Sequence, residues 1–396
     1  VIMSGHFVLA IPSVAAFFLG LILVALGTGL LKPNISAIVG EFYPPGDPRR
    51  DGGFTIFYMG INIGAALGPL VCGWLARDDR HYGFAAAGIG MLFGLIQFKI
   101  TQSQLGDAGR HPPARHDDDA AYQRKAWGGI LVFLALVFGL LVTGLTGVLS
   151  LDAAALAQSS TYVIVAMAFA YFGYVLVLGR LTREERGRVI VIIVLFFAAA
   201  MFWSGFEQAG SSLNLFAERY TIREFGGFEI PTSWFQSLNP VFIIILAPFY
   251  SILWIALAHR HLDPATPLKF AVGLIILGLG FAVMIGAAAL VADGQQVLPT
   301  WLFFTYLLHT MGELALSPVG LSSVTKLAPR RFVGQMMGIW FLAASLGNIL
   351  AGLLAGEFRA DALDEMPRLY TQIVLTTVGS GVILALCTKP LKRMIA

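Results

Sequence analysis

Charge is scarce in this sequence, and motifs of several site classes are missing. Of its 396 residues, 12% are Asp, Glu, Lys or Arg, about half the ~25% found in soluble domains. There is no GxxxxGKS/T phosphate-binding loop and no HExxH motif, which argues against a self-contained ATP-driven pump and a zinc site. The net charge of +3 comes without a basic run interleaved with aromatic residues, so we expect no nucleic-acid partner.

Cysteine is scarce as well. Cys72 and Cys387 each lie in an apolar run and match no metal-ligand spacing. Two such cysteines give no disulfide framework, so both are interpreted as small core residues. We therefore expect neither a metal nor any other cofactor.

Long apolar runs are abundant: 57% of the residues are hydrophobic, including 30 Phe. A membrane-spanning helix needs roughly 20 apolar residues. Such runs predict eleven full spans, at about 15–42, 53–76, 84–101, 126–149, 160–179, 188–217, 232–258, 268–291, 300–326, 332–356 and 369–391. Residues 1–11 read as the second half of another span without an initiator Met, so the natural protein is expected to extend upstream. The sequence predicts an all-α polytopic membrane protein.

Positive charge alternates from loop to loop. Of the 26 Lys and Arg residues, 19 fall on one set of alternate loops and six on the other. Because cytoplasmic loops are enriched in Lys and Arg, the side with 19, which includes the C-terminus, is predicted to be cytoplasmic. We expect a multi-pass protein of the inner (cytoplasmic) membrane.

The polar stretches divide the chain into four parts. Residues 1–101 are interpreted as the remainder of an N-terminal helix bundle, 102–125 as a cytoplasmic linker, 126–179 as a two-helix insertion and 180–396 as a C-terminal six-helix bundle. The insertion spans have almost no polar residues in their interiors, which favours a lipid-facing position. Two six-helix bundles with an insertion, and the first helices missing here, indicate a transporter.

Three ionisable residues lie deep in predicted spans. Counting 1.5 Å per residue from the helix ends places Lys32 and Glu207 about 15 Å and Glu313 about 20 Å into the membrane. Charges at this depth are costly and usually functional, and transporter sites lie near the midplane. The alternative is a structural ion pair that holds helices together. We favour binding or proton handling.

Neighbours of these residues repeat an i, i+4 spacing, which places them on one helix face. The groups are Trp203 with Glu207, Tyr58 with Asn62, and His309 with Glu313 and Ser317. For each aromatic alone, ordinary packing is the simpler interpretation. His309 is interpreted as a hydrogen-bonded residue at a helix interface, and a Ser317–His309 nucleophile is a weak alternative.

Glycine and proline predict local geometry. Gly60, Gly64 and Gly68 form a stripe of small residues typical of close helix packing in membranes. Pro240 and Pro318 each follow a polar residue and predict kinks in their spans.

Three sequence blocks resemble the proton-dependent oligopeptide transporter (POT) family of the major facilitator superfamily. They are GTGLLKPNISAIVGEFYPPGDPRRDGGFTIFYMGINIGA at 27–65, FWSGFEQAGSSLNLFA at 202–217 and GELALSPVGLSSVTKLAPRRFVGQMMGIW at 312–340. The resemblance runs the whole length, and the helix pair at 126–179 is similar to that of bacterial members. It implies the major facilitator fold of two six-helix bundles. The family's ExxER-type motif would lie upstream of Val1.

The resemblance also implies roles for individual residues. Lys32 would meet the carboxylate of a peptide and pair with Glu313 as a salt-bridge gate. Glu207 would exchange the coupling proton. Asn62 and Asn239 would hold the peptide backbone.

Further residues would complete the peptide site. Glu313 would face the amino terminus of the peptide, with Ser317 nearby. Side-chain pockets would be shaped by Tyr58, Trp203, Phe206 and Trp340.

The function expected from this resemblance is import of di- and tripeptides coupled to protons, by alternating access, with no enzymatic activity. The expected partners are small peptides, protons and the lipid bilayer, and we expect a monomer. Within transport, the alternative is a relative that moves another small anion or a drug-like solute. A different class is a membrane scaffold or receptor that transports nothing.

Overall fold

We describe the fold from a computed structural model of the 396-residue chain. The structure describes residues 1–42, 49–106, 108, 124, 127–132, 135–136, 138–139, 143–144, 153–356 and 366–395. The side chain of Lys32, most of the predicted linker 102–125 and much of the predicted span 126–149 lie outside the described part. The chain divides into two compact units, Val1–Asp152 and Ala153–Ala396, and each is described by itself.

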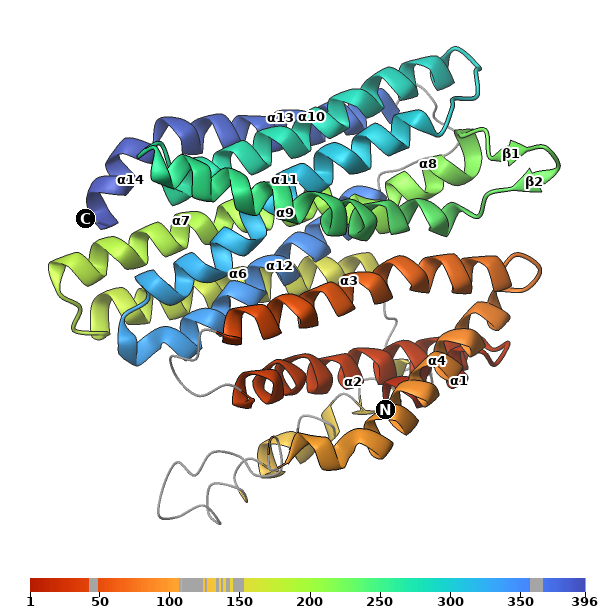
Figure 1. The fold of residues 1–396 in the computed structure, drawn as a ribbon, viewed down its shortest axis with the longest axis horizontal. Helices are drawn as coiled ribbons and strands as arrows, with labels where there is room; N and C mark the ends of the chain where they lie inside the picture. The colour runs from red at the N-terminus through yellow and green to blue at the C-terminus, as the bar shows by residue number, and fades with distance from the viewer. Residues whose placement is uncertain are drawn as a thin grey trace. The chain divides into compact units, whose positions relative to one another are not determined.

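The described part of the first unit contains α-helices at predicted membrane-spanning runs and a short 3₁₀ segment (Figure 1). They are α1 (Ile2–Leu9), α2 (Val14–Glu41), α3 (Arg49–Leu75), α4 (Arg80–Thr101) and η1 (Gln102–Leu105). The first two pack closely, since a Cβ at Gly27 would lie 2.5 Å from Cγ1 of Ile2. Asp79 caps α4 by accepting the backbone N–H of His81 at 2.9 Å. This bond and a side-chain bond to the same His lower the pKa of Asp79.

The predicted glycine stripe of α3 does not pack closely against the described residues. A Cβ added at Gly60, Gly64 or Gly68 would have no described atom within 4 Å. Spacing alone identified a smooth face of the helix, but it could not show which face a neighbouring helix covers. Close approaches among the described residues of this unit lie elsewhere: between α1 and α2, and between α3 and α4, where a Cβ at Gly83 would lie 2.8 Å from the carbonyl oxygen of Cys72.

The second unit is a larger helical bundle with one short hairpin (Figure 1). Its α-helices are α6 (Ala153–Leu178), α7 (Arg183–Phe206), α8 (Ser212–Tyr220), α9 (Leu238–His259), α10 (Thr266–Ala292), α11 (Thr300–Leu327), α12 (Val333–Gly356), α13 (Met366–Leu386) and α14 (Thr388–Ile395). Its other elements are η2 (Glu207–Gly210), β1 (Glu224–Phe225), β2 (Phe228–Glu229), η3 (Thr232–Ser237) and η4 (Arg330–Phe332).

Two predicted spans are not continuous α-helices. The span predicted at 188–217 changes from α7 to the 3₁₀ turn η2 at Glu207 and resumes as α8. The span predicted at 232–258 begins as η3 and becomes α9 at Leu238. Pro240 therefore lies in the first turn of α9, where its missing N–H breaks no helical bond. The kink predicted at Pro240 is wrong, whereas Pro318 does lie inside α11.

By length and composition, nine helical stretches of the described residues could cross a membrane. They coincide with nine of the eleven predicted spans. The helix predicted at 300–326 is present as α11, although it is not among these nine. The chain is therefore a multi-pass membrane protein.

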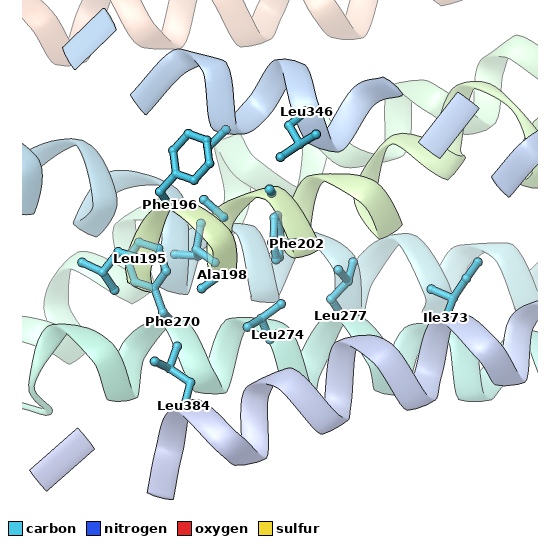
Figure 2. Packing of buried hydrophobic residues seen from close by; sticks show 14 of the residues in the cluster. Leu195, Phe196, Ala198, Phe202, Phe270, Leu274, Leu277, Leu346, Ile373 and Leu384 are labelled. Atoms are coloured by element: carbon cyan, nitrogen blue, oxygen red, sulfur yellow. The ribbon is translucent and has the colours of Figure 1, made fainter. Parts of the chain in front are cut away.

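The core of the second unit lies between α7, α10, α12 and α13 (Figure 2). Side chains of α7 and α10, such as Phe202 and Leu277, point into the same layer and are fully buried. Lipid is as apolar as these side chains, so their burial gains little transfer energy, and close van der Waals packing must hold the helices together. This bundle positions the polar residues of the site.

The helix α6, from the predicted insertion, packs against the other helices of the second unit. The ring of Phe172 lies 5.8 Å from that of Phe196 on α7. At the end of α6, the guanidinium of Arg331 donates to the carbonyls of Gly179 at 2.6 Å and Arg180 at 3.0 Å. One side of α6 remains exposed, with Val177 77% accessible, as a lipid-facing helix requires.

Candidate functional site

A buried carboxylate on α11 is held by a side chain from α9. Glu313 is 9% exposed, and its Oε2 accepts a hydrogen bond of 2.9 Å from Nδ2 of Asn239. The same amide donates to Oγ1 of Thr310 at 3.0 Å. In turn, Thr310 donates to the carbonyl of Tyr306 at 2.8 Å. A neutral amide thus satisfies part of the carboxylate, and no second side-chain donor to it is found in the described part of the chain.

The start of α9 explains the position of Asn239. Since η3 precedes the helix, Asn239 lies in the first turn, beside Pro240, whose ring is compatible with that turn. Further along α9, the hydroxyl of Tyr250 donates to the carbonyl of Met311 at 2.9 Å. Hydrogen bonds from two residues that are eleven positions apart on α9 therefore fix this helix against α11.

A glycine contact fixes the other side of α11. A Cβ at Gly312 would lie 2.7 Å from the carbonyl oxygen of Gly273, and a Cβ at Gly273 would lie 2.9 Å from that of Gly312. Helices α10 and α11 can approach this closely only because both residues lack a side chain. Because Gly312 directly precedes Glu313, this contact sets the depth and rotation of the carboxylate.

Glu207 lies where a membrane helix is interrupted. It begins η2, with φ −73° and ψ 0°, and Ser211 leaves the helical region with φ −125° and ψ −97°. The part-buried Glu207 interacts electrostatically with Glu313. The two carboxylates predicted from sequence therefore lie in one unit and within electrostatic range of each other.

Buried Gln208 stabilises this interruption. Its side chain is fully buried, and its Nε2 donates to the carbonyl of Ala351 on α12 at 3.0 Å. Its Oε1 accepts a hydrogen bond of 2.6 Å from Oγ of Ser212, at the start of α8. In addition, the hydroxyl of Tyr306 on α11 donates to the carbonyl of Ala209 at 3.3 Å. Interrupted helices within a membrane need such replacement partners.

Trp203 and Phe206 lie in the last turn of α7, directly before this interruption. Their ring centroids are 5.3 Å apart in an edge-on arrangement, and the ring of Phe206 lies 6.4 Å from that of His309. These contacts join the predicted aromatic residues of α7 to the polar face of α11.

His309 and Ser317 have different surroundings from those predicted. The ring of His309 is 1% exposed and lies 4.7 Å from Phe281. Neither of its ring nitrogens has a hydrogen-bond partner among the described residues. The predicted helix-interface position is confirmed, but the predicted hydrogen bond is not found in the described part. The hydroxyl of Ser317 is buried and likewise has no partner there.

Trp340 lies in the hydrophobic core. It is 9% exposed, its ring lies 6.0 Å from that of Phe270, and a Cβ at Gly320 would meet the indole at 2.5 Å. The structure thus places Trp340 against α10 and α11. Its predicted role in a side-chain pocket stays a prediction.

The predicted site residues of the first unit are described only in part. Asn62 is buried and donates from Nδ2 to the carbonyl of Tyr58 at 3.0 Å. The side chain of Tyr58 is 44% exposed. Lys32 lies in α2, but its side chain is outside the described residues, so its predicted pairing with Glu313 stays a prediction.

Sequence reasoning missed Gln208, Thr310, Tyr306 and the Gly273–Gly312 contact. A signal was present for Gln208, which follows Glu207 directly inside an apolar run. Thr310 lies three residues before Glu313, on the same face. Among the described residues, no group of His, Cys, Asp or Glu side chains is arranged to bind a metal ion.

Comparison with known proteins decides the family. The model of the POT family matches residues 1–367. The chain belongs to the POT family. This confirms the predicted family, and the membership places the chain among transporters and not enzymes.

Individual relatives agree with this assignment. The peptide transporter YePEPT of Yersinia enterocolitica subsp. palearctica is 42% identical, over 98% of this chain and 78% of the relative. A di-/tripeptide transporter of Lactococcus lactis subsp. cremoris is 33% identical, over 98% of this chain and 78% of the relative.

Solved structures confirm the predicted fold class, the all-α major facilitator fold. A peptide transporter POT in complex with sulfate matches with a TM-score of 0.90 and 38% identity, over 99% of this chain and 79% of that one. A POT family transporter in complex with a thioalcohol-conjugated peptide matches with a TM-score of 0.86 and 30% identity, over 98% and 80%.

Proposed function

We propose that this POT-family chain imports di- and tripeptides together with protons, by alternating access across the inner membrane. The observation that carries the proposal is the neighbouring pair of carboxylates in the second unit, one held by Asn239 and one at a helix interruption. Relatives named as peptide transporters support the substrate class.

The chemistry of a peptide suits the residues assigned to it. A peptide brings an ammonium and a carboxylate into a low dielectric, so each needs a fixed partner of opposite charge. Glu313 would receive the amino terminus and Lys32 the carboxylate, and the two would pair with each other when the site is empty. Asn62 and Asn239 would bind backbone groups, which all peptides share.

The remaining predicted residues would set breadth of specificity. Loose apolar walls accept many side chains, because discrimination by apolar contact is weak. Such walls would be supplied by Tyr58, Trp203, Phe206 and Trp340. Ser317 would lie near the amino terminus of the bound peptide.

Glu207 would carry the coupling proton. One charge that moves inward across the membrane gains about 2.3 kcal/mol per 100 mV. Protonation of Glu207 would free its partner and shift the equilibrium between the conformations of the transporter, which would couple proton entry to peptide entry. We propose a monomer as the transporting unit.

The deciding experiment uses the purified protein in proteoliposomes with a pH-sensitive dye inside. An inside-negative potassium-diffusion potential should drive uptake of a labelled dipeptide and, in the same vesicles, peptide-dependent acidification. Peptide uptake without proton movement would refute the coupling. Peptide uptake no greater than in protein-free vesicles would refute transport of peptides.

A second candidate is transport of another small anion or a drug-like solute. Solved relatives are in complex with alafosfalin and with 5-aminolevulinic acid, which favours testing these compounds. If either is accumulated and no di- or tripeptide competes with it, the second candidate replaces the first.

Orientation can be tested with the natural cysteines. Cys387 directly follows α13 and is exposed, so its interpretation as a core residue is wrong. It lies on the side proposed as cytoplasmic. In the Cys72→Ala variant, an impermeant maleimide should label right-side-out vesicles only after permeabilisation. Labelling of intact vesicles would place the C-terminus outside.

A further inference from the structure

A cavity of about 410 Å³ in the second unit lies apart from the site around Glu313. It opens between the first turn of α10, the second half of α11 and the C-terminal helix α14. Its volume is within the ~300–1,000 Å³ of small-molecule sites. Its polar lining consists of Asp263, Thr266, Lys269, Ser323, Lys326 and Lys392.

The charges around this cavity are mostly positive. Nζ of Lys269 pairs with Oδ1 of Asp263 at 2.7 Å and lies 4.4 Å from the ring centre of Trp254, so this lysine is neutralised and fixed. Lys326 and Lys392 are exposed, and neither has a carboxylate within 4 Å among the described residues. Two ammonium groups are therefore available to an anion.

Neutral donors complete the lining. The hydroxyls of Thr266 and Ser323 lie 3.2 Å apart, and Ser323 is 7% exposed. Thr266 is also the first residue of the 27-residue helix α10, whose N-terminus carries partial positive charge. Ammonium groups, hydroxyls and a helix N-terminus together match the oxygens of a phosphate.

The cavity lies at the ends of two long helices, the level at which a membrane-spanning helix is expected to meet lipid headgroups and water. It is formed where α10 begins and α11 ends. Trp254, beside Lys269, is of the residue type enriched at membrane interfaces. In α14, Leu391 is buried whereas Lys392 is exposed, as in a basic amphipathic helix that lies along a membrane surface.

We propose that this cavity binds a phosphate group, held by the ammonium groups of Lys326 and Lys392 and by the hydroxyls of Thr266 and Ser323. The headgroup of an anionic phospholipid is the source that the level of the cavity favours, and free phosphate is the other source. The bound group would join α10, α11 and α14, so it would stabilise the folded protein.

The test measures thermal unfolding of the detergent-purified protein with added phosphatidylglycerol, phosphatidylcholine or inorganic phosphate. Binding to the folded state alone raises the apparent Tm. We expect phosphatidylglycerol at saturation to raise it by roughly 2–8 °C, and phosphatidylcholine to raise it by much less. A comparable rise with inorganic phosphate alone would identify free phosphate as the ligand.

Variants locate the effect. The double variant Lys326→Gln/Lys392→Gln should lose the shift, and each single variant should raise the half-saturating concentration about 10-fold. The matched control is Lys389→Gln/Arg393→Gln, which removes two charges from α14 outside the cavity and should keep the shift. The proposal is overturned if neither anion stabilises the protein, if the shift survives in the first pair, or if both pairs lose it equally.

Discussion

Two segments of the second unit carry a membrane-buried carboxylate, and their backbones differ. Around Glu313, α11 is one helix of 28 residues, and Asn239 donates directly to the carboxylate. Around Glu207, the helix changes to a 3₁₀ turn, and the side chain of Gln208 replaces helical hydrogen bonds.

This difference suggests different functions for the two carboxylates. A group in an unbroken helix, with a partner on a second helix, keeps one position and suits a fixed binding contact. A group at an interruption moves with a backbone that has few helical bonds to break, which suits a step coupled to conformational change. We therefore propose that the local backbone, and not depth in the membrane, distinguishes the roles of the two carboxylates.

The largest expected effect comes from removing the fixed charge. Glu313→Gln should weaken binding of a dipeptide about 10- to 100-fold, because a hydrogen bond to a charged group contributes about 1.5–3 kcal/mol. Isothermal titration in detergent measures this. Glu218→Gln, at an exposed carboxylate of α8, is the matched control and should bind normally. Unchanged affinity in Glu313→Gln would remove the fixed role from this residue.

Substituting Asn239, the hydrogen-bond partner of Glu313, tests the same fixed binding contact. Asn239→Ala leaves the carboxylate without its 2.9 Å donor and should weaken dipeptide binding about 5- to 50-fold, for a cost of about 1–3 kcal/mol. Asn239→Asp should be at least as harmful at neutral pH and partly recover when acidified, because two adjacent carboxylates cannot both ionise easily. Equal affinity of the two variants at every pH would contradict this geometry.

Substitution of Gln208, at the interruption, should lower the stability of the fold more than the affinity for a dipeptide. Gln208→Leu keeps the volume but removes the bonds to Ala351 and Ser212. Leaving these buried groups unpaired should lower stability by about 1–3 kcal/mol, seen as a lower Tm in detergent, while dipeptide affinity changes less than in Asn239→Ala. If affinity falls more than in Asn239→Ala, the interruption contributes directly to the binding site.

The smallest effect is expected at the hydrogen bond that joins the two segments. Tyr306→Phe removes one hydroxyl that donates to Ala209 at 3.3 Å, worth about 0.5–1.5 kcal/mol. Dipeptide affinity should stay within about 3-fold, and Tm should fall slightly. A loss of proton-driven uptake with normal binding would reveal that this bond transmits the coupling.

Much of this arrangement follows from sequence, because the costs in a membrane are large and local. Apolar runs predicted nine stretches that the structure confirms as long apolar helices, and the depth of Glu207 and Glu313 identified both as site candidates. The i, i+4 spacing of His309 and Glu313 on one helix is confirmed by the continuous α11.

The rest depends on contacts that no periodicity encodes. The 3₁₀ turn at Glu207 arises because Gln208 finds partners on α8 and α12, 4 and 143 residues away. Gly312 packs on Gly273 because two helices happen to cross there, whereas the regular stripe that includes Gly64 has no described atom against it. Residue spacing predicts faces of helices, and tertiary packing selects which faces are used.

The most direct test of the different roles is Glu207→Gln, assayed in one set of proteoliposomes for two activities. Counterflow exchange of a labelled dipeptide needs binding and movement but no net proton transfer. We expect exchange to stay within a few-fold of that of the unmodified protein. Accumulation driven by 100 mV should fall about 50-fold, the equivalent of about 2.3 kcal/mol for one charge. Loss of exchange and accumulation together, or normal accumulation, would contradict the assignment of the coupling proton to Glu207.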